Sequence, residues 1–379
     1  MDFKLTEEQE LIRSNIREFA VKNVDPIAAE IDENQRHPAE LFKKLAEGGW
    51  MGIPIPTQYG GSGSDYLTNA IVVEELARSC ASTGFTVSIH VGIACMLINL
   101  FGTEEQKKKY LVPLAKGEHL GAFVLTEPGA GTDVMSASTT AVLDGNDYVI
   151  NGTKTFISNG PTGDTYVAFA WTDKAARGKG MSCFIIPKGT PGMKPGQHFS
   201  KMGLRSSQTS ELVFKDCRIP KENIIGQPGQ GLAIAMTGFD HGRVGIAAQC
   251  VGILQAALDE SIKYSKERVQ FGQPIARQEA ISWMIANMAT DLTAARFLTY
   301  YAAWLKDQKK VFSKEASMAK LFGAEKAMEH TIKAVQIHGG YGYIKGQKVE
   351  RLMRDAKITE IYEGTSEAQR LVISGNVLR

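Results

Sequence analysis

The sequence predicts an α+β fold with an N-terminal helical domain, a middle β-barrel domain and a C-terminal four-helix bundle. Apolar residues recur at helical spacing in residues 1–120. Prolines and short strand-like runs gather in residues 121–228. Long helical patterns return in residues 229–379. At 379 residues, the chain is long enough for several domains that act as one unit.

The first zone begins with a helix start signal. Thr6 and Gln9 have the spacing of a capping box, and Leu11, Ile16 and Phe19 follow at helical spacing. Further helical stretches are expected around residues 41–45, 67–77 and 106–114, separated by runs rich in proline and glycine.

The middle zone reads as β structure. Seven of the 13 prolines lie in it, which disfavours long helices. Residues 142–150 predict a strand, a turn at Asp144-Gly145 and a second strand. Further strands are expected at residues 166–171, 182–186 and 211–214, and short strands at this spacing suggest a small barrel or sandwich.

The last zone contains three long helical stretches with short connections. They cover about residues 231–266, 277–306 and 314–337, with apolar residues on one face and good helix formers elsewhere. Such helices pack as a bundle.

Composition excludes several classes of protein. The formal net charge is +2, and acidic and basic residues are interspersed. This distribution does not indicate binding to nucleic acid or to an anionic membrane. No apolar run approaches the roughly 18 residues that span a bilayer, and no secretory signal is visible. A cytoplasmic, bacterial-type enzyme is therefore expected, or an organellar matrix enzyme if a leader has been removed.

Neither cysteines nor histidines suggest a metal site. The five cysteines are odd in number and far apart, without C-x-x-C, so buried free thiols are expected. The seven histidines lack metal-ligand spacing, and no metal is predicted.

Two glycine-rich runs, residues 127–133 and 339–343, could suggest a dinucleotide site. Neither lies in the strand, G-x-G-x-x-G and helix context of a Rossmann unit. Taken alone, each predicts a tight turn whose backbone allows a ring or a phosphate to approach closely.

Five longer motifs occur in order along the chain. They are Leu125-Thr126-Glu127-Pro128-Gly129-Ala130-Gly131-Thr132-Asp133, Asn151-Gly152-Thr153-Lys154-x-Phe156-Ile157-Ser158-Asn159-Gly160, Arg268-x-Gln270-Phe271-Gly272-x-Pro274, Gln336-Ile337-x-Gly339-Gly340-x-Gly342 and Tyr362-Glu363-Gly364-Thr365-Ser366-Glu367-x-x-Arg370. This set resembles the signatures of acyl-CoA dehydrogenases over essentially the whole chain. The helix–barrel–helix architecture of that family agrees with the three zones.

The resemblance implies that Glu363 is the catalytic base. It would take the α-proton of an acyl-CoA while the β-hydrogen leaves as hydride to N5 of bound FAD. Partial burial raises the pKa of such a carboxylate toward the working range. The Glu363 backbone N–H and a flavin hydroxyl would polarise the thioester carbonyl.

The resemblance also implies residues that bind FAD. Those near the flavin ring are Phe123, Leu125, Thr126, Gly131, Thr132, Phe156, Ile157 and Ser158. The pyrophosphate motif Arg268, Gln270 and Phe271 and the segment Gln336, Ile337, Gly339 and Gly340 would reach FAD from a neighbouring subunit, because the family places those contacts there. Thr365, Ser366 and Glu367 match the adenosine side.

Four positions depart from the family pattern. Phe156 stands where many relatives have Trp and keeps an apolar face, and Ser158 replaces a frequent Thr and keeps the hydroxyl. Whether Glu279 contacts FAD is left open, and His338 replaces an apolar residue, which favours a variation in packing.

The substrate residues implied by the family are Thr132, Asp240, Gly242, Arg243, Tyr362 and Gly364. Asp240 would meet the pantetheine or adenine end, and Arg243 would help fix the loop that bears Glu363. Relatives specialised for isovaleryl or long chains place their base just before this Arg. Gly242 therefore disfavours those subfamilies.

The expected function is oxidation of a short-chain acyl-CoA to the trans-2-enoyl-CoA, with electrons passing to electron-transferring flavoprotein and with a homotetramer built as a dimer of dimers. Branched-chain or cyclic substrates, and the reverse reaction as an enoyl-CoA reductase, stay open. An acyl-CoA oxidase or a monooxygenase on this fold is disfavoured by chain length. A non-enzymatic acyl-CoA-binding protein is disfavoured by the Glu363, Arg268 and Thr132 set.

Overall fold

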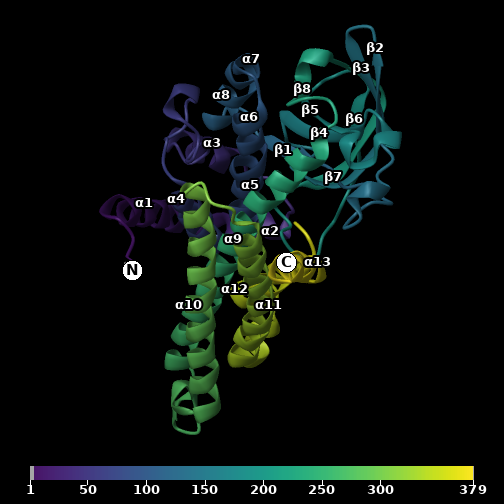
Figure 1. The fold of residues 1–379 in the computed structure, drawn as a ribbon. Coiled ribbons are helices and arrows are strands. Elements are labelled where there is room, and N and C mark those ends of the chain that lie inside the picture. Colours follow the sequence, from purple (N-terminus) through teal and green to yellow (C-terminus); the bar gives the residue numbers. More distant parts are fainter. Residues whose placement is uncertain (1–3, 379) are drawn as a thin grey trace.

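The computed structural model describes residues 4–378 and orders them as helices, a sheet and helices (Figure 1). The N-terminal helices and the sheet stand beside each other in the upper half of the view, and the long C-terminal helices extend downward from them. The α+β fold with helical ends and a middle sheet is confirmed.

The first N-terminal helix starts where the sequence predicts. Thr6 caps α1 in a capping box with Gln9, which confirms the predicted pair and stabilises the helix end by about 1 kcal/mol. Gln9 also donates to Asp65, which caps α4, so the two helix starts are joined. The helices are α1 (Glu7–Asn23), α2 (Ala28–Glu33), α3 (Ala39–Glu47), α4 (Tyr66–Ser79), α5 (Ala81–Ile89), α6 (Met96–Phe101), α7 (Glu104–Gln106) and α8 (Val112–Ala115).

One stretch of residues 4–378, Ala81–Phe101, is long and apolar enough by length and composition to cross a membrane, with mean hydropathy 1.8. It comprises α5, a π-helical turn at His90–Cys95 and α6. Because 83% of its apolar window is buried inside the protein, it is a core helix. The prediction that no apolar run approaches this length was wrong, because uncharged residues such as Ser88 and His90 continue the run.

The middle zone forms one sheet and confirms the predicted strands. Its strands are β1 (Gly121–Val124), β2 (Thr140–Asp144), β3 (Asp147–Ser158), β4 (Thr165–Trp171), β5 (Met181–Pro187), β6 (Met193–His198), β7 (Thr209–Pro220) and β8 (Ile224–Ile225). The path is β6-β7-β3-β2-β4-β5-β8, with β1 parallel to β4. The predicted hairpin is present, although Asp144 pairs with Asp147, so its two-residue loop is Gly145-Asn146.

This sheet coils around its own core. Its two halves meet at one residue pair between β2 and β4, Thr140 with Trp171. Their apolar faces then turn toward each other, and the rings of Tyr148 and Phe184 meet at 5.1 Å edge to face. Among the described residues, the end strands β6 and β8 do not pair, so the barrel is open along that seam.

The C-terminal helices confirm the three predicted long stretches. They are α9 (Gly231–Glu267), α10 (Glu279–Asp307), α11 (Ser313–His338), α12 (Lys348–Lys357) and α13 (Ser366–Val377), with a short hairpin β9 (Val269–Gln270) and β10 (Gln273–Pro274) after α9. Glycine lets α9 approach its neighbours closely. A Cβ at Gly252 would lie 2.3 Å from the Glu74 carbonyl oxygen of α4.

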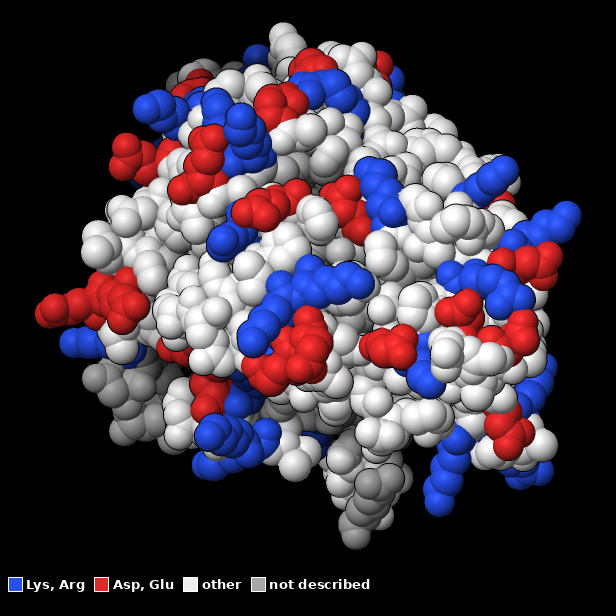
Figure 2. All heavy atoms as spheres, turned by 90° about the horizontal axis from the view of Figure 1, so that it is seen from above, with Lys and Arg blue, Asp and Glu red and all other residues white. Residues whose placement is uncertain are grey.

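Buried carboxylates on α4 join this helix to the bundle and to α1. Glu74 on α4 accepts from Arg296 and Tyr300 of α10, and Glu75 accepts two hydrogen bonds from Arg17 of α1. On the face in Figure 2, Lys and Arg lie beside Asp and Glu rather than gathering by sign. All five cysteines are free and buried, as predicted.

Candidate active site

Glu363 lies on a short loop between α12 and α13. Its φ is 50° and that of Gly364 is 91°, so two consecutive residues adopt the left-handed conformation. This conformation costs a non-glycine residue roughly 1–2 kcal/mol, which the surrounding contacts must offset. The loop therefore presents Glu363 in a fixed direction.

The Glu363 carboxyl faces the middle of α9. Its Oε2 atom is buried and has no hydrogen-bond partner within residues 4–378. A Cβ at Gly242 would lie 2.7 Å from this oxygen and 2.8 Å from Cδ1 of Ile93. Burial raises the pKa of Glu363 to about 7, although the nearby cations Arg243 and Lys320 oppose the shift. A carboxyl with this pKa can accept a proton near neutral pH.

Asp240 and Arg243 form an ion pair one helical turn apart on α9. Arg243 Nη1 donates to Asp240 Oδ1 at 2.8 Å, and Ser313 of α11 donates to the same oxygen at 2.8 Å. Arg243 is buried, and its Nε has no partner within the described residues. The pair holds Arg243 near Glu363.

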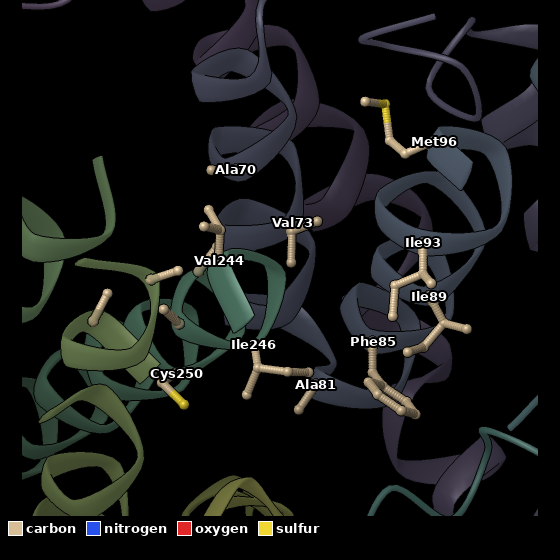
Figure 3. Packing of buried hydrophobic residues seen from close by; sticks show 14 of the residues in the cluster. Ala70, Val73, Ala81, Phe85, Ile89, Ile93, Met96, Val244, Ile246 and Cys250 are labelled. Atoms are coloured by element: carbon tan, nitrogen blue, oxygen red, sulfur yellow. The ribbon is translucent and has the colours of Figure 1, made fainter. Parts of the chain in front are cut away.

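Tyr362 is locked beside the base. Its hydroxyl donates to Gln249 of α9, and its ring stacks on Phe85 with 4.7 Å between centroids. Phe85, Ile89, Ile93 and Met96 lie in a row along one side of the buried helical stretch (Figure 3). This row gives the site an apolar wall.

The apolar wall extends from the Glu363 carboxyl to strand β1 of the sheet. A Cβ at Gly238, one turn before Gly242, would lie 3.4 Å from Ile93 and 3.5 Å from the Phe123 ring. Phe123 on β1 also meets Phe239 at 5.8 Å. The structure thus brings Phe123 close to the α9 turn that faces the base.

The loop after β1 is tied to β3 by a buried ion pair. Lys154 Nζ donates to Glu127 at 2.8 Å and to the Leu125 carbonyl at 2.9 Å, and the Glu127 carboxylate also accepts from residues 138 and 139. Burial alone would raise the pKa of Glu127, but Lys154 and these hydrogen bonds hold it at about 2.

This loop is the predicted tight turn, closed by reciprocal hydrogen bonds between Glu127 and Ala130. A Cβ at Gly129 or Gly131 would meet nothing within 4 Å, so the backbone faces open space there. Of the predicted residues, Thr132 is exposed, Thr126 is half-buried, and Leu125 is buried in the core.

The end of β3 exposes an aromatic ring. Phe156 is 64% exposed, has a φ of 56°, and lies 4.9 Å from the ring of Phe199. Its neighbour Ile157 packs into the sheet core, and Ser158 is half-buried. Phe156 offers a free apolar face that a planar ring could cover.

A second group of predicted residues lines a groove at the far tip of the bundle. The groove has a volume of about 690 Å³, and its lining includes Arg268, Gln270, Phe271, Ile337, Gly339 and Gly340. Phe271 is 95% exposed, and a Cβ at Gly340 would meet nothing within 4 Å. Gln336 is exposed and adjoins Ile337 without lining the groove.

The two groups are separated by the length of α9. Gly242 and Arg268 are 26 residues apart, or roughly 39 Å along a continuous helix at 1.5 Å per residue. One chain therefore brings together Phe123, Gly242, Arg243, Tyr362 and Glu363, but not the groove residues.

The two doubtful positions behave differently. His338 lines the groove, yet its Nδ1 lies 2.8 Å from the Ala334 carbonyl and its ring stacks on Tyr264 at 4.3 Å. These contacts agree with the expected variation in packing. Gln278 lines the groove, whereas Glu279 is exposed at the start of α10.

The predicted adenosine-side residues begin α13. Thr365 caps that helix by accepting from the Ala368 amide at 3.2 Å. Ser366 is buried, with no partner for its hydroxyl within the described residues, and Glu367 is exposed in the first turn.

Two residues that hold the Glu363 loop were missed by sequence reasoning. Lys320 of α11 donates to the Gly364 carbonyl at 2.6 Å, and Gln369 of α13 donates to the carbonyls of Gly364 and Glu363. A signal did exist, because Lys320 falls on the buried stripe of α11 with Ala316, Gly323 and Ala327.

Taken together, the fold places a buried carboxyl with a raised pKa beside an apolar wall, between a sheet domain and a helical bundle. Three family profiles match the chain: the acyl-CoA dehydrogenase N-terminal domain over residues 6–118, the middle domain over 122–217 and the C-terminal domain over 229–378. The chain belongs to the acyl-CoA dehydrogenase family and is an oxidoreductase of that family.

Similar proteins span the chain from end to end. The short-chain specific acyl-CoA dehydrogenase of Clostridium acetobutylicum is 54% identical over all of both chains. The acryloyl-CoA reductase (NADH) of Anaerotignum propionicum is 50% identical over 100% of this chain and 96% of the relative.

Solved structures agree with these matches. The butyryl-CoA dehydrogenase of Megasphaera elsdenii superposes with a TM-score of 0.98 at 45% identity, over all of both chains. A chain from work on the electron transferring flavoprotein of Acidaminococcus fermentans gives a TM-score of 0.99 at 50% identity, also over all of both chains.

Proposed function

We propose that this protein oxidises a short-chain acyl-CoA to the trans-2-enoyl-CoA, with FAD as cofactor and Glu363 as the base. The observation that carries the proposal is the buried, unpaired Oε2 of Glu363 on a loop with fixed conformation. An α-proton beside a thioester is weakly acidic, so its removal needs a carboxylate whose pKa lies near the working pH. Glu363, with a pKa of about 7, meets that need.

The surrounding residues support proton abstraction. Arg243 and Lys320 favour the ionised carboxyl before the reaction, and burial favours the protonated form afterwards. Within residues 4–378, the Glu363 amide N–H donates no hydrogen bond. It is therefore available to a thioester oxygen, where it would stabilise the negative charge that develops as the α-proton leaves.

The described residues fit FAD. The open backbone at Gly129 and Gly131, the exposed ring of Phe156 and the hydroxyl of Ser158 suit the flavin end. The Arg268 guanidinium beside the open backbone at Gly339 and Gly340 suits a pyrophosphate. When bound, FAD supplies the two-electron acceptor for the hydrogen that leaves the β-carbon.

A dimer of dimers would complete the cofactor site. The roughly 39 Å along α9 between Gly242 and Arg268 is too long for one FAD to meet both groups in the same chain. A neighbouring subunit would then supply the groove. Exposed apolar residues on α10, among them Trp283, Tyr301 and Trp304, favour burial in a homotetramer.

A short acyl chain is favoured by the walls of the site. Phe85 stacks on Tyr362 and extends the row that contains Ile93, so bulky side chains occupy the space beside the base. The short-chain relative from Clostridium and the butyryl-CoA dehydrogenase support the same choice. Branched or cyclic acyl-CoA substrates are tested by comparing kcat/KM across a panel with an artificial electron acceptor.

Electron-transferring flavoprotein is the proposed oxidant. Support comes from the chain similar to this one that was solved in work on the electron transferring flavoprotein of Acidaminococcus fermentans. Stimulation of turnover by purified electron-transferring flavoprotein, with no artificial acceptor present, tests this partner.

A second candidate function is reduction of an enoyl-CoA by the same site. The acryloyl-CoA reductase relative, at 50% identity, favours it. By microscopic reversibility, Glu363 would then be protonated at the start and would deliver its proton to the α-carbon. The two directions separate on whether the physiological partner donates electrons to the protein or takes them away.

The deciding experiment is anaerobic addition of butyryl-CoA to the FAD-loaded protein. Loss of the flavin absorbance is expected, and Glu363→Gln should keep its FAD yet lose the response. If no acyl-CoA bleaches the flavin, the proposed oxidation of an acyl-CoA is wrong. If Glu363→Gln is reduced at the wild-type rate, Glu363 is not the base.

A further inference from the structure

The loop that carries Glu363 is held through its backbone. Lys320 Nζ donates to the Gly364 carbonyl at 2.6 Å, and Gln369 Nε2 donates to the same carbonyl at 2.8 Å. Gln369 also reaches the Glu363 carbonyl at 3.1 Å. Two side chains from different helices thus hold two consecutive peptide units.

These contacts act where the backbone is strained. Both Glu363 and Gly364 have positive φ, and a side chain is disfavoured in that region. A Cβ at Gly364 would lie 2.6 Å from Gln369 Nε2, so glycine is needed for the amide to reach both carbonyls. Without the two donors, Glu363 could relax toward an ordinary conformation and carry its carboxyl away from Gly242.

Lys320 is a buried cation, with 0% of its surface exposed. Burial lowers its pKa to about 8, so it stays mostly charged at pH 7. Burial also raises the pKa of the neighbouring Cys250 thiol to about 12 and keeps it neutral. The remaining charged groups that face Lys320 are the carboxylates Glu363, Glu360 and Glu367 and the cation Arg243.

Charged or titratable groups from four segments face the Glu363 carboxyl. Arg243 comes from α9 and Lys320 from α11, and both favour its ionised form. Tyr66 of α4 and Tyr362 also face Glu363, and burial raises the pKa of each phenol, so both stay neutral. Lys320 is thus one of the two cations that act on the carboxyl.

We propose that Lys320 and Gln369 are positioning residues for Glu363: together they hold the Glu363–Gly364 backbone in its left-handed conformation, and Lys320 adds a positive charge beside the carboxylate. This inference rests on the proposed function, because it assigns a purpose to the base. Neither residue needs to touch the substrate. Lys320 acts in two ways, as a donor and as a charge, and Gln369 acts as a donor only.

Amide hydrogen exchange measures the positioning without turnover. In FAD-loaded Lys320→Met, peptides covering residues 358–370 are expected to exchange several-fold faster than in the wild type, with the rest of the chain unchanged. Lys326→Met is the matched control on α11, because Lys326 forms half-buried ion pairs with Asp291 and Glu329, and neither pair involves the Glu363 loop. Equal exchange in residues 358–370 of wild type and Lys320→Met would overturn the positioning role.

The pH profile of flavin reduction by butyryl-CoA measures the charge. Loss of the Lys320 cation should move the midpoint of the wild-type profile upward by roughly half to one pH unit. Lys320→Gln keeps an N–H donor without the charge, so it should show the same shift with a higher plateau rate than Lys320→Met. Gln369→Met should lower the plateau without moving the midpoint.

The outcomes separate this inference from the proposed function. If butyryl-CoA fails to reduce the wild type, the proposed function fails, and hydrogen exchange alone decides whether Lys320 holds the loop. If the wild type is reduced and Lys320→Gln shares its midpoint, the charge role is wrong. If Lys320→Met does not fold or loses FAD, Lys320→Gln and Gln369→Met carry both measurements.

Discussion

At the scale of single residues, the site depends on a glycine, which has no side chain to fill the space beside the base. Gly242 leaves room for the Glu363 carboxyl, because even a methyl group there would come within 2.7 Å of Oε2 and 2.8 Å of Ile93. Glu363 is fixed through its backbone and cannot easily withdraw. The position of the Glu363 carboxyl therefore depends on glycine at residue 242.

Gly242→Ala is expected to lower kcat/KM for butyryl-CoA by about 100-fold, because a displacement of the base near 1 Å has that effect. Steady-state assays with an artificial acceptor measure the loss. Gly375→Ala is the control, since a Cβ at Gly375 meets nothing within 4 Å. If Gly242→Ala keeps wild-type kcat/KM, the steric argument for this glycine is wrong.

The stability of the folded protein should depend on the ionisation of the Glu363 carboxyl. The pKa of Glu363 is raised in the fold from an ordinary 4.5 to about 7, so the fold favours the protonated form. This favourable contribution is present below pH 4.5 and is lost as pH rises through 7. Glu363→Gln stays neutral, so its unfolding midpoint should rise relative to the wild type between pH 5 and pH 8.

Thermal or denaturant unfolding of the FAD-loaded proteins at pH 5, 6, 7 and 8 provides the measurement. Glu47→Gln is the control, because Glu47 is exposed at the end of α3 and lies outside the proposed site. A constant difference between wild type and Glu363→Gln at all four pH values would contradict the raised pKa.

At the scale of elements, the buried pair Lys154–Glu127 joins strand β3 to the loop after β1. It connects the segment with Gly129 and Gly131 to the strand that ends at Phe156. Removing one partner of a buried ion pair leaves an uncompensated charge, whereas removing both is milder. The pair therefore keeps the two proposed flavin segments in register.

Lys154→Met alone is expected to lower the free energy of unfolding by about 3–5 kcal/mol and to reduce FAD content. The double variant Glu127→Gln with Lys154→Met should recover part of that stability. Denaturant unfolding and the flavin-to-protein absorbance ratio measure both effects. A double variant less stable than Lys154→Met would show that the loop needs the carboxylate itself.

Elements were predictable where periodicity was strong. The limits of α9, α10 and α11 lie within two residues of the stretches expected from the sequence. The strand β6 was not predicted, because Pro195 and Gly196 disfavour strands and its residues are largely exposed at a sheet edge. The proposed site motifs are short and continuous, so their residues could be named from the sequence alone. The contacts of Lys320 and Gln249 with the loop join helices that are distant in sequence, and no local pattern indicates them.

Conformation at single residues also escaped prediction. Phe156 and Glu363 both have positive φ, which no side-chain pattern announces for a non-glycine residue. The separation of the predicted cofactor residues into two distant groups could not be derived from spacing. It follows from α9 being one unbroken helix.

At the scale of the whole molecule, each chain presents two separate groups of the residues proposed for the site. One surrounds Glu363 and the other is the groove with Arg268 at the bundle tip. If neighbouring subunits pair these groups, then a defect in each group can be complemented by the other chain.

Co-expression of Arg268→Ala and Glu363→Gln chains tests this. Each variant alone should be nearly inactive, but random pairing should recover about a quarter of the wild-type flavin reduction, because half the dimers contain one intact site. Differently tagged chains allow the mixed oligomer to be purified. The control pairs Glu363→Gln with a chain that carries both substitutions, and no recovery in the test pair would place Arg268 and Glu363 in the same chain's site.

The 37-residue helix α9 has a consequence for how this chain can vary. One inserted residue between Arg243 and Arg268 would rotate everything beyond it by about 100° and turn the tip groove in another direction. Seven deleted residues would nearly keep the phase but shorten the reach by about 10 Å. If neighbouring subunits share the site as proposed, the distance between them limits the lengths of α9 that the chain can tolerate.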